Sequence, residues 1–87
     1  METQAIVDII AGRAREVLPD LGTRPLGSAD SLRELGANSI DRAEILMLTT
    51  ATLGLRIPLI ELAQPRNVGE LAELLWERLA ERGARVA

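Results

Sequence analysis

Cysteine and histidine are both absent from this chain of 87 residues. Without cysteine there can be no disulfide framework, no thiolate nucleophile and no cysteine-based metal site. Histidine is the commonest general base and metal ligand, so its absence argues against unaided catalysis and against a metal centre. Any thiol chemistry would have to come from a group attached to the protein.

Aromatic residues are almost as scarce, at 1% of the chain, although hydrophobic residues make up 47%. The core must therefore be aliphatic and built from Leu, Ile, Val and Ala, a composition that suits helices. A chain of this length has room for one domain with one modest core, which buries roughly 60–65% of the surface that the unfolded chain exposes. The composition predicts a single all-α domain.

Lysine is missing too, so all ten basic residues are arginines, scattered from Arg13 to Arg85 without forming a run. We interpret most of them as solvated surface residues. A net charge of −3 argues against nucleic acid as a partner. The chain does not begin like a signal peptide, and its longest nearly apolar stretch, Ile45 to Leu55, is too short to span a bilayer. We expect a cytoplasmic protein with no membrane partner.

Proline and glycine divide the chain into helical segments around one long loop. Apolar residues at helical spacing predict a helix from Thr3 to Leu18, which Pro19 ends. Residues 20–37 then form a loop that is unusually long for a compact domain without a function there. Leu26 and Leu32 are predicted to attach this loop to the core. The apolar stripe of the first helix contains Ile6, Ile9, Ile10, Ala14, Val17 and Leu18.

Two further helices are expected near the end of the chain. Leu59 to Ala63, between two prolines, is long enough for about one helical turn. Asn67 can cap a final helix that runs to about Arg82. We expect residues 1–82 to form the domain and residues 83–87 a flexible tail. The buried face of the final helix is predicted to contain Val68, Leu71, Leu75 and Leu79.

The helix predicted from Ser39 to Leu53, with Gly54 placed to stop it, carries more apolar residues than one face can bury. One stripe, suited to the bundle, contains Ile45, Leu46, Thr49 and Leu53. A separate stripe contains Ile40, Ala43 and Met47. On helix geometry alone, either both stripes belong to the core or the second stripe is a surface for partners.

The six residues from Gly36 to Asp41 place Ser39 between the long loop and this helix. One interpretation is helix capping, because Asn38 and Ser39 are common capping residues and the negative charge of Asp41 favours the first turn. The other is that Ser39 carries a covalently attached cofactor arm. The six residues alone do not distinguish the two.

The wider segment Leu32–Leu46 resembles the phosphopantetheine-attachment segment of acyl carrier proteins, and the order of helices matches that family over nearly the whole chain. The resemblance implies an acyl-carrier-protein-like bundle of three main helices and one short helix, with a long loop between the first two. It implies 4'-phosphopantetheine attached at Ser39, where an acyl group is held as a thioester. The chain would then be a carrier and not an enzyme, with no catalytic residue of its own.

Departures from the general pattern of acyl carrier proteins indicate which kind of carrier this chain resembles. Asn38 stands where an Asp is usual, and Met47–Thr52 lacks the Glu residues of fatty-acid carriers. The run Gly36–Ile45, with Ile57-Pro58 and Asn67–Leu71, resembles the free-standing donor carriers of polyketide β-branching cassettes. That resemblance implies donation of an acetyl unit, formed from malonyl, to an enzyme similar to HMG-CoA synthase.

The resemblance also implies a partner-binding face on the second helix. Its expected residues are Asn38, Ile40, Asp41, Arg42, Ala43, Glu44 and Met47. The expected partners of the monomeric carrier are a phosphopantetheinyl transferase, an HMG-CoA synthase-like enzyme, an acyltransferase and a decarboxylating ketosynthase-like enzyme. Two alternatives remain open: a generic polyketide or peptidyl carrier, and a small helical interaction module without a prosthetic group.

Overall fold

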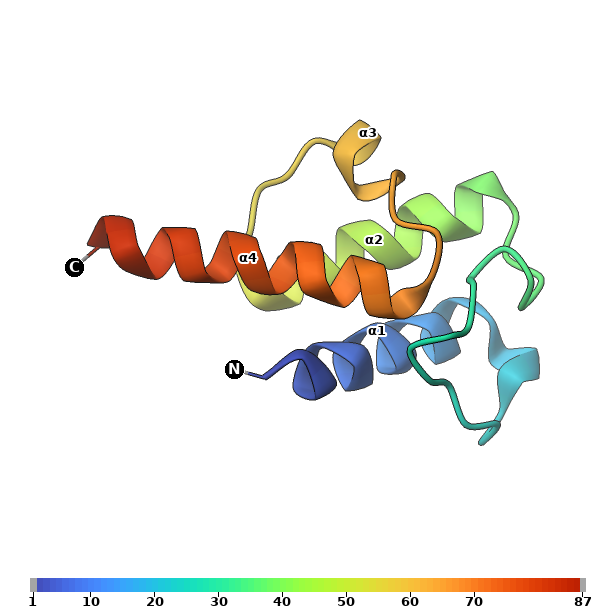
Figure 1. Ribbon diagram of the computed structural model, residues 1–87. Helices are drawn as coiled ribbons and strands as arrows, with labels where there is room; N and C mark the ends of the chain where they lie inside the picture. Colours follow the sequence, from blue (N-terminus) through green and yellow to red (C-terminus); the bar gives the residue numbers. More distant parts are fainter. Residues whose placement is uncertain (1, 87) are drawn as a thin grey trace.

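Four α-helices and one 3₁₀ turn form the chain in the computed structural model, which describes residues 2–86 and the side chains up to residue 83 (Figure 1). The elements are α1 (Thr3–Val17), η1 (Pro19–Leu21), α2 (Ser39–Leu53), α3 (Leu59–Leu62) and α4 (Val68–Val86). The predicted all-α fold, with a long loop before the second helix, is confirmed. None of the helices among these residues combines the length and apolar character that a membrane span requires.

The core lies where α1 packs against both α2 and α4, while the short α3 packs on α2 (Figure 1). Ile6, Ile10 and Leu75 are fully buried at this junction. The core is aliphatic, as the sequence predicts. The single aromatic residue of the sequence, Trp76, is 45% exposed. The main core cluster consists of Ile6, Val7, Ile10, Leu46, Leu53, Leu62, Val68, Leu71, Ala72 and Leu75.

The two apolar stripes of α2 have different environments. All four residues of the first stripe are buried, and the hydroxyl of Thr49 donates to the carbonyl oxygen of Ile45 at 2.7 Å. In the second stripe Ile40 is 76% exposed and Met47 is 62% exposed, while Ala43 is half-buried. The interpretation that places both stripes in the core is therefore wrong.

The long loop is attached to the start of α4. The backbone N–H groups of Val68 and Gly69 donate to the carbonyl oxygens of Asp30 and Ser28 at 2.9 and 2.8 Å. These groups belong to the first turn of a helix, where no intrahelical acceptor is available to them. Apolar side chains of the loop also pack against the core, and Leu26 and Leu32 are among them, as predicted. The full set is Leu21, Leu26, Leu32 and Leu35.

The final helix is longer than the sequence predicts. It continues four residues past Arg82, to Val86, and Ala87 lies outside the described residues. Gly83 does not stop α4 because it keeps a negative φ, whereas Gly54, which ends α2, is left-handed at φ 67°. Residues 83–86 of the predicted tail therefore belong to α4, and the flexibility of the tail stays a prediction.

Candidate functional site

Ser39 is the first residue of α2, and its side chain is exposed. The residue before it, Asn38, has an extended backbone and is the helix cap. The side-chain oxygen of Asn38 accepts a hydrogen bond from the N–H of Asp41 at 2.8 Å, and the carboxylate of Asp41 accepts one from the N–H of Asn38 at 3.2 Å. Capping therefore accounts for Asn38 and Asp41 but not for the Ser39 hydroxyl.

A tight turn brings the loop to this helix. Gly36 has φ 100°, a left-handed conformation that suits glycine, and the next residue, Ala37, is buried. The guanidinium of Arg42 donates to the carbonyl oxygen of Ala37 at 2.8 Å. The chain is thus held on both sides of the cap, and Ser39 is presented at a fixed place on the surface.

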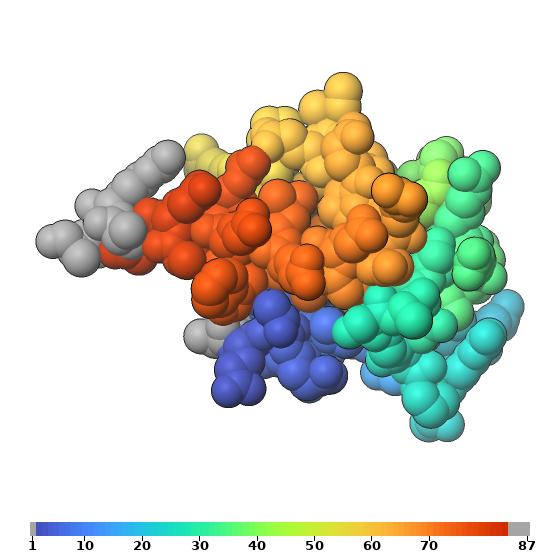
Figure 2. All heavy atoms as spheres, viewed as in Figure 1, coloured from blue at the N-terminus to red at the C-terminus, as the bar shows by residue number. Residues whose placement is uncertain are grey.

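Ser39 borders a groove of about 500 Å³ whose lining comes from the loop, α2, α3 and the segment that leads into α4. These segments converge at the end of the molecule away from the C-terminus (Figure 2). The groove has an apolar floor and a polar rim. Its buried floor residues are Leu46, Leu62, Val68 and Leu71.

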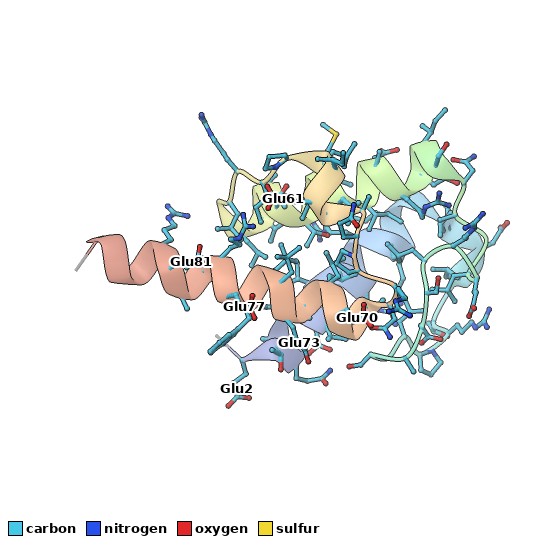
Figure 3. The ribbon with its side chains drawn as sticks, turned by 45° about the horizontal axis from the view of Figure 1, so that its top comes forward. Glu2, Glu61, Glu70, Glu73, Glu77 and Glu81 are labelled. Carbon is cyan, nitrogen blue, oxygen red and sulfur yellow. The ribbon has the colours of Figure 1, made fainter. Side chains whose placement is uncertain are left out.

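Positive charge dominates the rim of this groove. Arg33, Arg42 and Arg66 all line it, and none of the Asp or Glu residues that the structure describes does. The carboxylate of Glu70, next to the groove in sequence, accepts a hydrogen bond from the N–H of Arg66 at 3.0 Å. Other carboxylates lie along α4 (Figure 3). A groove lined by three arginines beside a helix N-terminus favours anionic ligands such as a phosphodiester.

An exposed apolar surface lies next to Ser39. It includes Ile40 and Met47 of α2, and α3 adds Leu59 at 44% and Ile60 at 74% exposure. Because α3 packs on α2, the two helices present this surface together. We call these four residues the apolar patch. Large exposed aliphatic side chains in one area are typical of surfaces that bind protein partners.

The structure brings together only part of the predicted site. Ser39, Arg42 and Ala43 line the groove. The predicted residues in the cap are Asn38 and Asp41, and those exposed on α2 are Ile40, Glu44 and Met47.

Sequence reasoning missed Arg33 and Arg66 of the groove, and Leu59 and Ile60 of the apolar patch. The arginines are isolated in the sequence, and no local pattern indicates that they meet. An exposed position for α3 could have been inferred from its length, because one turn buries few side chains.

Comparison with known proteins gives three findings. A family model described as "Phosphopantetheine attachment site" matches residues 4–75. The chain is 43% identical over 79 residues to the polyketide biosynthesis acyl-carrier-protein AcpK of Bacillus subtilis (strain 168), which covers 91% of this chain and 96% of that protein.

The fold also matches a chain in the crystal structure of the curacin biosynthetic pathway HMG synthase in complex with acetyl donor-ACP. That match has a TM-score of 0.80 and 46% sequence identity, and it covers 85% of this chain and 95% of the other.

Proposed function

Because this chain belongs to the phosphopantetheine-attachment family and is an acyl carrier protein, we propose that Ser39 is its attachment residue and that it donates acetyl units to an HMG synthase-like enzyme in polyketide β-branching. The observation that carries the proposal is an exposed serine hydroxyl on the first residue of α2, beside a groove rimmed by arginines.

The residues around Ser39 fit the prosthetic group. The free N–H groups at the start of α2 and the guanidinium of Arg42 would hold a phosphodiester, because both favour negative charge. When bound, 4'-phosphopantetheine supplies the thiol that this cysteine-free chain lacks, and an acyl group is carried on it as a thioester. Asn38 and Asp41 act indirectly, since they fix the first turn from which the serine projects.

Two observations support the donor role. One is the similarity to a carrier described as an acetyl donor in complex with an HMG synthase. The other is the apolar character of the exposed face of α2 next to Ser39. Ile40, Ala43 and Met47 would contact the synthase-like enzyme, with Arg42 and Glu44 as polar contacts at the edge.

The proposal includes the partners that such a role requires. A phosphopantetheinyl transferase would modify Ser39, an acyltransferase would load malonyl, and a decarboxylating ketosynthase-like enzyme would convert it to acetyl. The carrier would act as a monomer in the cytoplasm. A small helical bundle with an exposed attachment residue suits successive visits to several large enzymes.

Intact mass tests the attachment residue. After incubation with coenzyme A and a broad-specificity phosphopantetheinyl transferase, the wild-type protein should gain the mass of one phosphopantetheine. Ser39→Ala should gain none while keeping its helical circular dichroism. Ser28→Ala, which removes an exposed serine of the loop, should be modified like the wild type. Modification of Ser39→Ala would rule out the assignment.

A transfer assay tests the donor role. Loaded with acetyl, the carrier should pass its acetyl group to the HMG synthase-like enzyme of the same pathway. A carrier that is modified at Ser39 but never accepted by that enzyme would be a generic polyketide or peptidyl carrier. A chain that no transferase modifies would be a helical interaction module.

A further inference from the structure

From the arginine rim of the groove, we infer that Arg33 and Arg66 bind the free carboxylate of a malonyl-type unit carried at Ser39, so that the groove distinguishes a dicarboxylic cargo from a neutral acyl cargo. The inference rests on the proposed function, because it needs a loaded arm at Ser39. It adds a cargo-binding role for two residues that lie far apart in the sequence.

The distribution of charge in the groove favours an anionic ligand. The chain has 13 acidic and 10 basic residues, yet among the residues with described side chains three arginines and no acidic residue line this groove. The nearby carboxylates of Asp41 and Glu70 are hydrogen-bonded to backbone N–H groups. Glu34 is exposed on the loop, outside the lining. The groove is therefore a positive region on a protein of negative net charge, and an anion there would meet little competition.

The side chains of Arg33 and Arg66 are available to bind a ligand. Both residues are exposed, and neither forms a salt bridge with another residue among those that the structure describes. Arg42 differs, since it donates to the carbonyl oxygen of Ala37 and lies one helical turn after Ser39. We therefore assign Arg42 to the phosphodiester and the other two to the far end of the cargo.

The shape and polarity of the groove also suit a charged cargo. Its volume of about 500 Å³ is within the usual range for small-molecule sites. The apolar floor suits the uncharged part of an arm and lowers the dielectric constant near the rim, which strengthens attraction between charges. A guanidinium can bind a carboxylate through two parallel hydrogen bonds. A carboxylate between Arg33 and Arg66 would link the loop to the segment before α4.

The inference gives the groove a role in the order of events. Decarboxylation of a malonyl thioester breaks the bond between the α carbon and the carboxylate, releases carbon dioxide and adds a proton from water to the α carbon. The product is an acetyl thioester without a free carboxylate. Because the ligand of Arg33 and Arg66 is then gone, the acetyl unit is released from the groove and becomes available to the accepting enzyme.

Nuclear magnetic resonance of the four forms of the protein tests this inference. The apo, phosphopantetheine, acetyl and malonyl forms are prepared with the transferase and the matching coenzyme A derivatives, and intact mass confirms each loading. We expect the side-chain Nε–H signals of Arg33 and Arg66 to shift in the malonyl form relative to the acetyl form. In about 0.5 M salt the shift should decrease, because screening weakens exposed ion pairs.

Three variants sharpen the test. In the double variant Arg33→Gln/Arg66→Gln, the backbone amide signals of the groove residues should be the same in the malonyl form and in the acetyl form. Arg66→Lys keeps the positive charge and should keep part of the difference. Arg24→Gln removes an exposed loop arginine that does not line the groove and should behave like the wild type. The spectra of the unloaded variants check that each is folded.

The outcomes that would contradict this inference can be told apart from failure of the proposed function. Identical spectra for the malonyl and acetyl forms would overturn the inference while leaving the carrier assignment intact. Arginine shifts that are complete on addition of phosphopantetheine alone would assign both residues to the phosphodiester and also overturn it. Absence of any loading at Ser39 would overturn the proposed function and this inference with it.

Discussion

At the residue scale, Asn38 and Asp41 fix the first turn of α2, which carries the proposed attachment residue Ser39, by bonding to each other's backbone N–H groups. This reciprocal pair satisfies two N–H groups at the start of α2. Asn67 plays a comparable part for α4, since its side-chain oxygen accepts from the N–H of Glu70 at 2.8 Å. The two caps are chemically alike, but only the first adjoins Ser39.

Asn38→Ala should lower the free energy of unfolding by about 0.5–2 kcal/mol because it removes the cap of α2. Urea denaturation followed by circular dichroism measures this loss. Asn38→Asp keeps a capping oxygen, so it should fold normally and be modified at Ser39 at least as fast as the wild type.

Asn67→Ala is the matched control for this prediction. It should cost similar stability and leave the rate of Ser39 modification unchanged. If Asn38→Asp is modified normally but no longer transfers acetyl to the synthase-like enzyme, the neutral amide of Asn38 is a partner determinant and not only a cap.

At the scale of elements, α2 has one face in the core and another exposed on the surface. One face supplies buried aliphatic residues and Thr49 to the core, and the other exposes Ile40 and Met47. The later turns of α2 have no acidic residue after Glu44. Recognition through this helix should therefore depend on apolar contact more than on charge.

Met47→Glu should leave the fold and the modification of Ser39 intact but weaken acetyl transfer to the synthase-like enzyme about tenfold, or about 1.4 kcal/mol. Transfer assays at several carrier concentrations measure the effect. Thr52→Glu, also exposed on α2 but outside the apolar patch, should have little effect.

Two results would contradict the role of this face. Unfolding of Met47→Glu would show that Met47 contributes to the core. Steep weakening of the wild-type complex by salt would show that charge dominates recognition, since apolar contact is insensitive to screening.

The short α3 cannot form on its own, because one turn does not offset the cost of helix nucleation. It is held by the buried side chain of Leu62 and by the ion pair between Glu61 and Arg78 of α4. The hydrogen bond to Glu61 raises the pKa of Arg78 above its usual value. The pair therefore favours the folded state while both side chains carry their charges, and this contribution is lost as the pH rises through the range where arginine loses its proton.

Arg78→Gln should loosen α3 without unfolding the bundle, because it removes a contact between α3 and α4. Hydrogen exchange at the amides of Leu62 and Ala63 should become faster, while exchange in the core of α1 stays unchanged. Arg13→Gln, which breaks an ion pair with Glu16 inside α1, is the matched control and should not affect α3. Unchanged exchange in α3 would mean that Leu62 alone holds the turn.

At the scale of the whole molecule, the long loop and α4 depend on each other. A Cβ at Gly69 would lie 2.9 Å from the Cβ of Ser28 and 3.1 Å from its carbonyl oxygen. The absence of a side chain at Gly69 thus permits the close contact in which its N–H bonds to the loop. That contact fixes the loop a few residues before Arg33, which lines the groove together with residues of α3 and α4.

Gly69→Ala should destabilise the protein by about 1–3 kcal/mol through this overpacking, although alanine is by itself the better helix former. Thermal and urea denaturation measure the change. Gly12→Ala is the control, because a Cβ there meets nothing within 4 Å, and it should be neutral or stabilising. Equal stabilisation by both substitutions would show that the loop moves aside without cost.

Features that depend on neighbouring residues along the chain could be predicted without the structure. Helix periodicity, the Asn38 cap and the left-handed Gly54 act within a few residues, so α2 was predicted with its observed ends. The buried stripe of α2 followed from the same periodicity. The prediction that Ser39 carries the cofactor came from the family resemblance of the segment around it, which is also a local pattern.

Features that depend on residues far apart in the sequence could be known only from the folded chain. The groove needs the loop, α2, α3 and the start of α4 together, so no local signal indicates that Arg33, Arg42 and Arg66 line one groove. Likewise, the choice between core and surface for Ile40 and Met47 required knowing which face of α2 the other helices cover. Packing settles such questions because burial is a property of the assembled bundle, whereas helix formation and capping are properties of a single segment.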